Sequence, residues 1–366
     1  MKIREIIDHL EKLAPPSLQE PYDNVGLLTG DADAVCTGVI CSLDCTEQVV
    51  EEAIQKKCNI IVAHHPIVFS GLKKITGKSY VERTVIKAIK NDIAIYAIHT
   101  NLDNVIGGVN GMIGKKLGLK NCKVLAPKTG WLKKLISFVP EKQAEAVRTA
   151  LFEAGAGGIG NYSECSFSVN GEGSFKAGDN TNPFIGEKGI RHIEKETRVE
   201  VIYPAHAEAR ILRALFASHP YEEVAYDIIP LGNVYPEIGS GLVGELPESM
   251  DETAFLGLLK QVFGLQTLRH SSFTGKKTKK VAVCGGAGSF LISNALSAGA
   301  DAFVTSDLKY HEFFDADSKL LLADIGHYES EQFTIDLLQE EIAKKFPTFA
   351  VLKTTEKTNP VRYFLE

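Results

Sequence analysis

NIIVAHHP, Asn59–Pro66, is a short run of apolar residues that ends in two adjacent histidines and a proline. A continuous apolar run of this length is typical of a strand buried on both faces in a parallel sheet. The strand is expected to stop at the proline, which has no backbone N–H to donate. Since ligands bind at the carboxyl ends of strands in open α/β sheets, His64 and His65 would lie beside a binding crevice. The alternative is a pair of partly exposed loop histidines, and the dipeptide alone leaves both interpretations open.

Strands and helices alternate on both sides of this stretch. The expected strands are 39–43, 60–63, 93–98, 281–284, 302–304, 320–325 and a closing strand at 361–364. Helices are expected between them, from the spacing of their apolar residues. This order predicts an α/β domain with helices on both faces of one sheet.

The pattern changes between residues 127 and 239. The expected order there is βαββαβ, the ferredoxin-like split unit. Both flanks, 121–130 and 231–241, are rich in proline and glycine. We therefore expect a core domain formed by residues 1–126 and 240–366 and an inserted domain formed by residues 127–239, which is an ordinary domain size.

The composition narrows the class of protein. The 366 residues are 44% hydrophobic and 23% charged, as in globular proteins, and the length predicts about two or three domains. The formal net charge of −6 lacks the basic field that nucleic-acid binding needs. No apolar stretch approaches the roughly 18 residues of a membrane span. The N-terminus is too charged for a signal peptide, and the seven cysteines form no CxxC pair, so we expect a cytoplasmic protein.

Histidines and carboxylates gather where the predicted strands end. Five of the ten histidines lie at or just after such an end, and two pairs of these polar residues are spaced four apart, which places each pair on one helix face. The residues at strand ends are His64, His65, His99, Asp103, Asp307, His311, His327 and Glu331. Bringing these groups together without a cation would be costly, because burial and mutual repulsion oppose it.

These residue types predict a site for divalent metal ions. Three histidines and two carboxylates are too many for one tetrahedral ion with an open position. They suit two ions about 3.5–4 Å apart that share a carboxylate and a water. Imidazole and carboxylate donors fit zinc, manganese, iron, cobalt or nickel, and we expect zinc. Cys284 stands alone in its stretch and is a weak ligand candidate.

A second motif is GGAGS, 285–289, between a predicted strand and a predicted helix. Backbone N–H groups at a helix start can cradle a phosphate. However, Leu291 stands where the full GxGxxG pattern has its third glycine. A tight strand–helix turn explains the glycines equally well.

Six segments together resemble the Nif-three-like family, whose members are also named GTP cyclohydrolase I type 2 homologues. In chain order they are PYDNVGLLTG, AHHP, HTNLD, CGGAGS, TSDLKYHE and DIGHYESE. They lie in the two outer parts of the chain. A further segment in the predicted insert, HPYEEVAYDIIPL at 219–231, resembles the CutA/PII-like insert of the longer bacterial members.

The resemblance implies a Nif-three-like α/β core interrupted by a PII/CutA-like domain. It implies two divalent ions per subunit, with Glu331 as a candidate bridge, held by His64, His65, Asp103, His327 and Glu331. It also places three further residues on the lining of the same pocket, His99, Asp307 and His311. Finally, it implies a ring-shaped homohexamer, a trimer of dimers, with the metal sites facing an inner cavity.

Three hypotheses follow. The first is a metal-dependent hydrolase of a small nucleotide-like substrate, related to the GTP cyclohydrolase name, in which His99 or His311 carries the proton. The second is a non-catalytic metal-binding or regulatory ring whose PII-like domain senses a small molecule. The third is an adaptor for proteins or DNA, and the acidic charge argues against DNA. We take the first as the working hypothesis.

Overall fold

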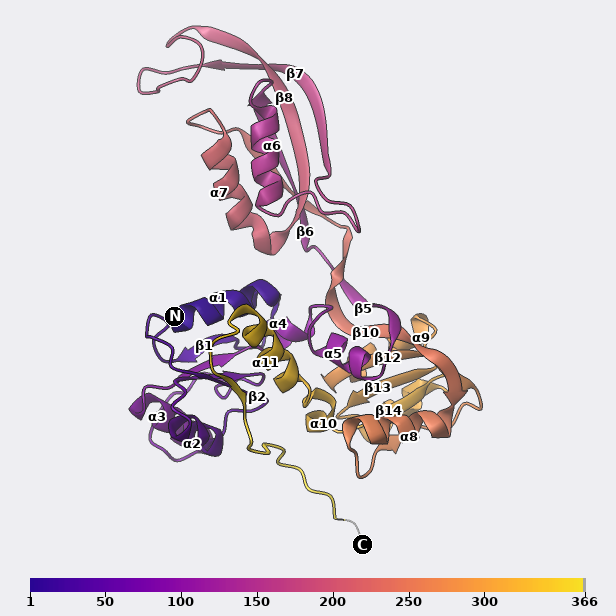
Figure 1. Ribbon diagram of the computed structural model, residues 1–366. Coiled ribbons are helices and arrows are strands. Elements are labelled where there is room, and N and C mark those ends of the chain that lie inside the picture. Colours follow the sequence, from indigo (N-terminus) through magenta and orange to yellow (C-terminus); the bar gives the residue numbers. More distant parts are fainter. Residues whose placement is uncertain (365–366) are drawn as a thin grey trace. The chain divides into compact units, whose positions relative to one another are not determined.

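The computed structural model describes residues 1–364, and the chain divides into two compact units (Figure 1). Unit 1 consists of Met1–Pro127 and of the chain from Pro236 onward, whereas unit 2 consists of Lys128–Tyr235. Both units mix helices with sheets, so the predicted α/β class is confirmed. Over the same 364 residues, no helix is long and apolar enough to cross a membrane.

The first sheet of unit 1 contains the strand that precedes the two histidines. Its order is β1-β4-β3-β2-β15, with β1 antiparallel to β4 and the other neighbours parallel. In that order the strands are Gly26–Thr29, Ala94–Ala97, Ile60–Ala63, Val39–Ser42 and Val351–Lys353. Every residue of β2, β3 and β4 is buried, which explains their continuous apolar runs.

The remaining strands of unit 1 form a second sheet, so the prediction of one sheet was wrong. Its order is β11-β14-β13-β12-β10-β5, and β12, β13 and β14 are parallel. In that order the strands are Arg269–His270, Leu321–Asp324, Ala302–Ser306, Lys277–Ala287, Val234–Asp251 and Lys120–Thr129. The long strands β5 and β10 extend this sheet on one side, and their partly polar sequences hid them from an apolar-run search.

The predicted closing strand at 361–364 was also wrong. These residues are exposed and have no strand structure, whereas the strand that does pair with β2 is β15. Val351 at its start is buried in the core, which the side chains of 361–364 are not. Burial of a side chain, rather than local β-propensity, decides which segment joins the sheet.

Helices cover both sheets of unit 1. They are α1 (Ile3–Leu13), α2 (Glu47–Gln55), α3 (Tyr80–Lys90), α4 (Thr100–Asp103), α5 (Val109–Lys116), α8 (Glu252–Phe263), α9 (Ile292–Ser297), α10 (His327–Glu331) and α11 (Thr334–Lys345). Short 3₁₀ turns are η1 (Pro16–Leu18), η3 (Ser289–Leu291) and η4 (Tyr310–Ala316). One continuous core takes in a face of each sheet together with α1, α5, α8 and α11. Helices α2 and α3 cover the other face of the first sheet, and η3 and α9 cover that of the second. The shared core fixes the strand ends of the two sheets relative to each other.

Unit 2 has the predicted element order βαββαβ. Its elements are β6 (Leu132–Pro140), α6 (Ala144–Glu153), β7 (Ser166–Lys176), β8 (Arg191–Pro204), η2 (Ala205–Ala207), α7 (Glu208–Ser218) and β9 (Tyr226–Leu231). The sheet is antiparallel with the order β7-β8-β6-β9. Helices α6 and α7 pack on one face of it through a separate core, which includes Leu135, Val147, Val199 and Ile211.

Candidate metal centre

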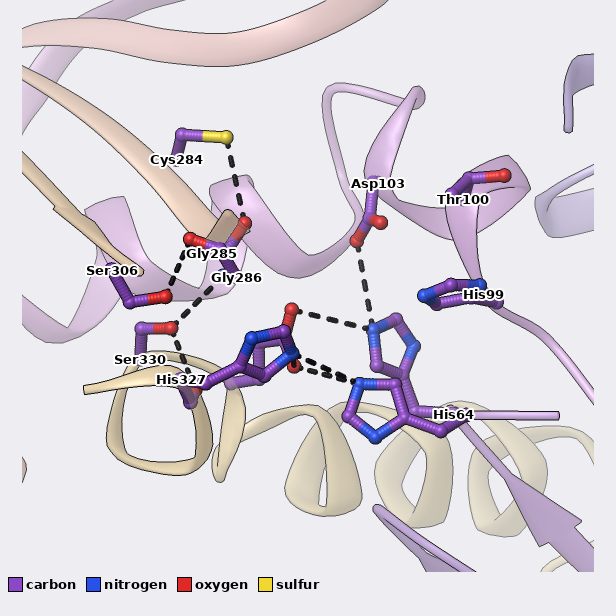
Figure 2. A network of polar contacts seen from close by, with 12 residues as sticks. His64, His99, Thr100, Asp103, Cys284, Gly285, Gly286, Ser306, His327 and Ser330 are labelled. Carbon is purple, nitrogen blue, oxygen red and sulfur yellow. Dashed lines mark hydrogen bonds and ion pairs between the residues drawn. The ribbon is translucent and has the colours of Figure 1, made fainter. Parts of the chain in front are cut away.

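Residues from both sheets of unit 1 meet at one cluster (Figure 2). His64 and His65 follow β3, and His99 follows β4, all in the first sheet. His327 and Glu331 lie on α10, which follows β14 of the second sheet. The donor atoms of His64, His65 and His99 lie within 4.8 Å of one another, and so do those of His65, His327 and Glu331. The residues therefore converge as predicted, but from the strand ends of two sheets rather than one.

The turn after β3 brings the two adjacent histidines together. The His64 and His65 amides still donate to the carbonyls of Ser42 and Leu43, so the backbone stays tied to β2 and the residue after it. The two rings nevertheless lie with centroids 5.0 Å apart and planes at 45°, whereas side chains of successive strand residues point to opposite faces. The end of the strand at this point directs both imidazoles to the same cluster.

Glu331 is the buried carboxylate at the centre of the cluster, with 3% of its side chain exposed. Its Oε2 atom lies 3.0 Å from His65 Nε2 and 3.1 Å from His327 Nε2. Its Oε1 atom faces His64 Nε2 at 3.9 Å. Burial alone would raise the pKa of Glu331, but the imidazoles outweigh it and hold that pKa well below its usual value. One oxygen of the Glu331 carboxylate thus faces His64, and the other contacts His65 and His327.

Two buried atoms in the cluster lack a hydrogen-bond partner within residues 1–364: His64 Nε2 and Asp103 Oδ1. They lie 3.7 Å apart. The Asp103 side chain as a whole is 24% exposed, and Oδ1 is its inward atom. His64 Nδ1 donates to the carbonyl of Ile98 at 2.8 Å, so Nε2 of the neutral ring carries the lone pair. A lone pair and a carboxylate oxygen that face each other without a donor form a setting that a cation would satisfy.

Each of the other three imidazoles is oriented by a carboxylate. Nδ1 of His65 donates to Asp44 at 2.8 Å, that of His327 to Asp307 at 2.6 Å, and that of His99 to Asp23 at 2.8 Å. Metal-binding histidines usually have such a partner, which fixes the tautomer and turns Nε2 toward the ion. Burial alone would lower the pKa of His65, but the two carboxylates beside it raise the pKa to about 10. A proton and a metal ion would compete for its Nε2.

Asp44 and Asp23 were not among the residues predicted for the site. Asp44 lies two residues beyond the end of β2, so the strand-end rule applied to 39–43 could have found it. It is held in turn by Thr358, whose hydroxyl donates to Asp44 Oδ2 at 2.6 Å, a contact across more than three hundred residues that no local pattern reveals. Asp23 lies in PYDNVGLLTG, and its Oδ2 also accepts from the amide of Thr100 at 3.0 Å.

The chain is similar to known proteins over nearly its whole length. A family model described as Duf34/NIF3 (NGG1p interacting factor 3) matches residues 1–360. The chain belongs to this family. A GTP cyclohydrolase 1 type 2 homolog of Bacillus subtilis is 40% identical over 344 residues, which are 93% of this chain and 91% of that protein. One of Halalkalibacterium halodurans is 42% identical over 324 residues, 88% of this chain and 87% of that protein.

Solved structures of the Duf34/NIF3 type share the fold. A Bacillus cereus protein related to NIF3 superimposes with a TM-score of 0.87 at 39% identity, covering 100% of this chain and 99% of that one. Staphylococcus aureus protein SA1388 gives a TM-score of 0.78 at 30% identity with the same coverage. The resemblance drawn from the six segments is thus confirmed.

Two further predicted residues differ in their placement in this Duf34/NIF3 chain. Asp307 contacts His327 and so joins the cluster. His311 lies on the exposed turn η4, with its ring beside Tyr310 and Phe314 at centroid distances of 5.1 and 6.3 Å. The structure therefore brings Asp307 but not His311 to the other candidates, because Asp307 precedes η4, with φ +56°, and no α-helix contains both residues.

The GGAGS loop lies against Glu331. The amide of Gly286 donates to Ser330 Oγ at 3.0 Å (Figure 2). That of Gly285 donates to Asn110 Oδ1, also at 3.0 Å, so both N–H groups are engaged by side chains. Gly286 has φ +64°, and a Cβ there would lie 2.4 Å from Glu331 Oε1. The glycines thus permit close approach to the carboxylate, and this explains the motif better than a phosphate cradle does.

Cys284 does not strengthen the donor set. Its thiol donates to the carbonyl of Gly285 at 3.4 Å (Figure 2). Burial, together with the charges of Asp103 and Glu331, raises the pKa of this thiol. A thiolate, which is the form that binds metal, is therefore strongly disfavoured.

Proposed function

We propose that the cluster is a dinuclear divalent-metal centre. The residues that would hold the ions are His64, His65, Asp103, His327 and Glu331, with Glu331 shared between them. The observation that carries the proposal is the buried pair His64 Nε2 and Asp103 Oδ1, which has no hydrogen-bond partner among residues 1–364. Imidazole and carboxylate donors suit zinc, and also manganese, iron, cobalt or nickel.

The donors fall into two groups that meet at Glu331. On the Oε1 side are His64 and Asp103, and on the Oε2 side are His65 and His327. A carboxylate with each oxygen directed to a different set of donors is suited to bridging two cations. Asp44 and Asp307 would position the second group through the hydrogen bonds to its imidazoles.

We infer that this centre belongs to a hydrolase of a small nucleotide-like substrate, in keeping with the names of the relatives. When bound, the ions would supply Lewis-acid polarisation of the substrate and would lower the pKa of a nearby water. His99 is the chain's own proton carrier in this proposal, because its ring lies 5.2 and 5.4 Å from those of His64 and His65. Asp23 holds the Nδ1 proton and would stabilise the imidazolium after Nε2 accepts a second proton.

The test loads the purified protein with one metal at a time and counts the bound ions by elemental analysis. Two ions per chain are expected, with turnover of GTP or simple phosphoesters in at least one loaded form. His65→Ala should lose both. His9→Ala is the control, since His9 contacts the carbonyl of Glu341 and lies outside the cluster. If the ions bind but a broad substrate screen gives no turnover, the metal centre stands and the hydrolase is refuted.

We further propose that unit 2 is a ferredoxin-like domain of the CutA/PII type, supported by its βαββαβ order and by the strand order β7-β8-β6-β9. The resemblance of the six segments to the family supports a cytoplasmic homohexamer. Light scattering of the purified protein should give six times the mass of 39.9 kDa, and a dimer or monomer would exclude the ring. A regulatory role would require that unit 2 itself bind a small molecule.

A further inference from the structure

Unit 2 contains a cavity of about 600 Å³, a volume typical of small-molecule sites. It is lined by β7, by the loop between β7 and β8, and by the segment that follows α7. Every lining residue belongs to unit 2, so the cavity shares no residue with the candidate metal centre.

Strand alternation explains why space is left here. Val139 and Val199 pack beneath the helices, so Phe138 and Glu196 face the opposite side of the sheet. Gly171 pairs with Glu196 across β7 and β8, and a Cβ on Gly171 would meet nothing within 4 Å. On the helix-free face of the sheet, the missing side chain of Gly171 therefore leaves open space.

Aromatic rings form a wall of the cavity. The ring of Tyr221 lies 5.8 Å from that of Phe175 and 6.3 Å from that of Phe184. The Tyr221 hydroxyl donates to Glu196 Oε1 at 2.9 Å, so a carboxylate is fixed at the edge of the wall. Aromatic faces attract cations through their quadrupole, and the attraction grows when water is excluded.

The lining of the cavity is net negative, which also favours a cation. Four glutamates line the cavity against two basic residues, Lys176 and Arg198. The guanidinium of Arg198 is already paired with Glu200 at 2.9 Å, and Glu200 does not line the cavity. Burial raises the pKa of Glu196, which means that ionising this carboxylate there has a cost that a bound cation would offset.

We propose that this cavity binds a small organic cation with an apolar body. The charged group would lie against Glu196, and the apolar body against Phe175, Phe184 and Tyr221. The proposal does not depend on hydrolysis at the metal centre, because it concerns binding by unit 2 alone. It names the class of molecule that a regulatory role would need.

The test uses the full-length protein and three probes of the same shape: benzylamine, benzyl alcohol and benzoate, which are cationic, neutral and anionic at neutral pH. Binding is measured by ligand-observed NMR titration. Benzylamine should bind about tenfold tighter than benzyl alcohol, the factor that corresponds to about 1.4 kcal/mol, and benzoate should bind weakest. Equal affinity for the three probes, or a preference for benzoate, would overturn the proposal.

Three variants locate the binding site. Glu196→Gln should weaken benzylamine about tenfold and leave benzyl alcohol unchanged, whereas Gly171→Leu should fill the cavity and block both. Glu208→Gln is the matched control, because Glu208 accepts a hydrogen bond from Tyr203 at 2.9 Å within unit 2 and does not line the cavity. Wild-type binding by Gly171→Leu, shown by its melting curve to be folded, would refute the assignment. If Gly171→Leu does not fold, the two probes on Glu196→Gln decide.

Discussion

Gly286→Ala tests whether the position of Glu331 controls metal binding. Gly286 lies at φ +64°, and an added Cβ would lie 2.4 Å from Glu331 Oε1. Real Cβ atoms essentially never come closer than 3.0 Å to such an atom, so the carboxylate would have to move by at least 0.6 Å, the difference between these distances. Glu331 is buried and held through Oε2 by His65 and His327, so it cannot move away from the methyl group without disturbing those contacts.

The expected loss is one of metal affinity more than of stability. A binding site needs its ligands within about 0.5 Å of the productive geometry, and a displacement of this size exceeds that tolerance. Losing the contacts that orient a metal ligand typically lowers metal affinity about 10–100-fold. In addition, an alanine in the left-handed region costs about 1–2 kcal/mol of folding free energy.

Gly264→Ala separates the two effects. Gly264 ends α8 at φ +66°, nearly the same φ as that of Gly286, but a Cβ there would meet nothing within 4 Å. Both variants should therefore lose similar free energy of unfolding in urea. Only Gly286→Ala should lose zinc affinity in competition with a chelating dye.

Two results would refute the reasoning. If Gly286→Ala binds zinc as tightly as the wild type, Glu331 is not a ligand whose position matters. If Gly264→Ala loses as much affinity as Gly286→Ala, the effect is a general response to backbone strain and says nothing about Glu331.

Three other predictions concern the same unit. Asp44→Asn, which weakens the support of His65, should lower zinc affinity about 10–100-fold in the dye assay and leave the fold unchanged by circular dichroism. Chelation of metal should lower the melting temperature, since free metal at 100 times its Kd stabilises the folded state by about 2.7 kcal/mol; an unchanged melting curve would contradict the metal centre. Glu52→Ala should cost about 1.5–3 kcal/mol in urea unfolding, because Thr354 and Thr355 lose hydrogen bonds to a charged acceptor. These hydrogen bonds outweigh burial and lower the pKa of Glu52, so the difference from wild type should be present above pH 4.5 and shrink as the pH falls below it.

Much of the candidate site could be predicted from local sequence, because a buried parallel strand leaves a clear apolar run. NIIVA marks β3, and the polar residues that follow such a run must lie at a strand end. His64, His65 and His99 were found in this way. The four-residue spacing of His327 and Glu331 also held, since α10 is an α-helix.

The rest depended on contacts that local sequence does not record. Whether parallel strands form one sheet or two is decided by their pairing, and the runs at β3 and β13 look alike although they belong to different sheets. The same four-residue spacing failed at Asp307 and His311 because Asp307 precedes η4 and no α-helix contains both residues. The partner of Asp44, Thr358, lies in a segment with no periodic pattern at all.

The two-sheet origin of the cluster would give the proposed ions a structural role as well. His64, His65 and Asp103 come from segments that follow strands of the first sheet, whereas His327 and Glu331 come from α10 after the second. The two sheets share an apolar core, but the imidazoles and carboxylates of the cluster are polar and gain nothing from apolar burial. Two buried atoms that have no hydrogen-bond partner among residues 1–364 cost free energy where the sheets meet, so the core alone does not favour their approach. Cations bound there would instead attract the donor atoms that follow both sheets. The ions would then hold the two sheets together through the same donors that position them for chemistry.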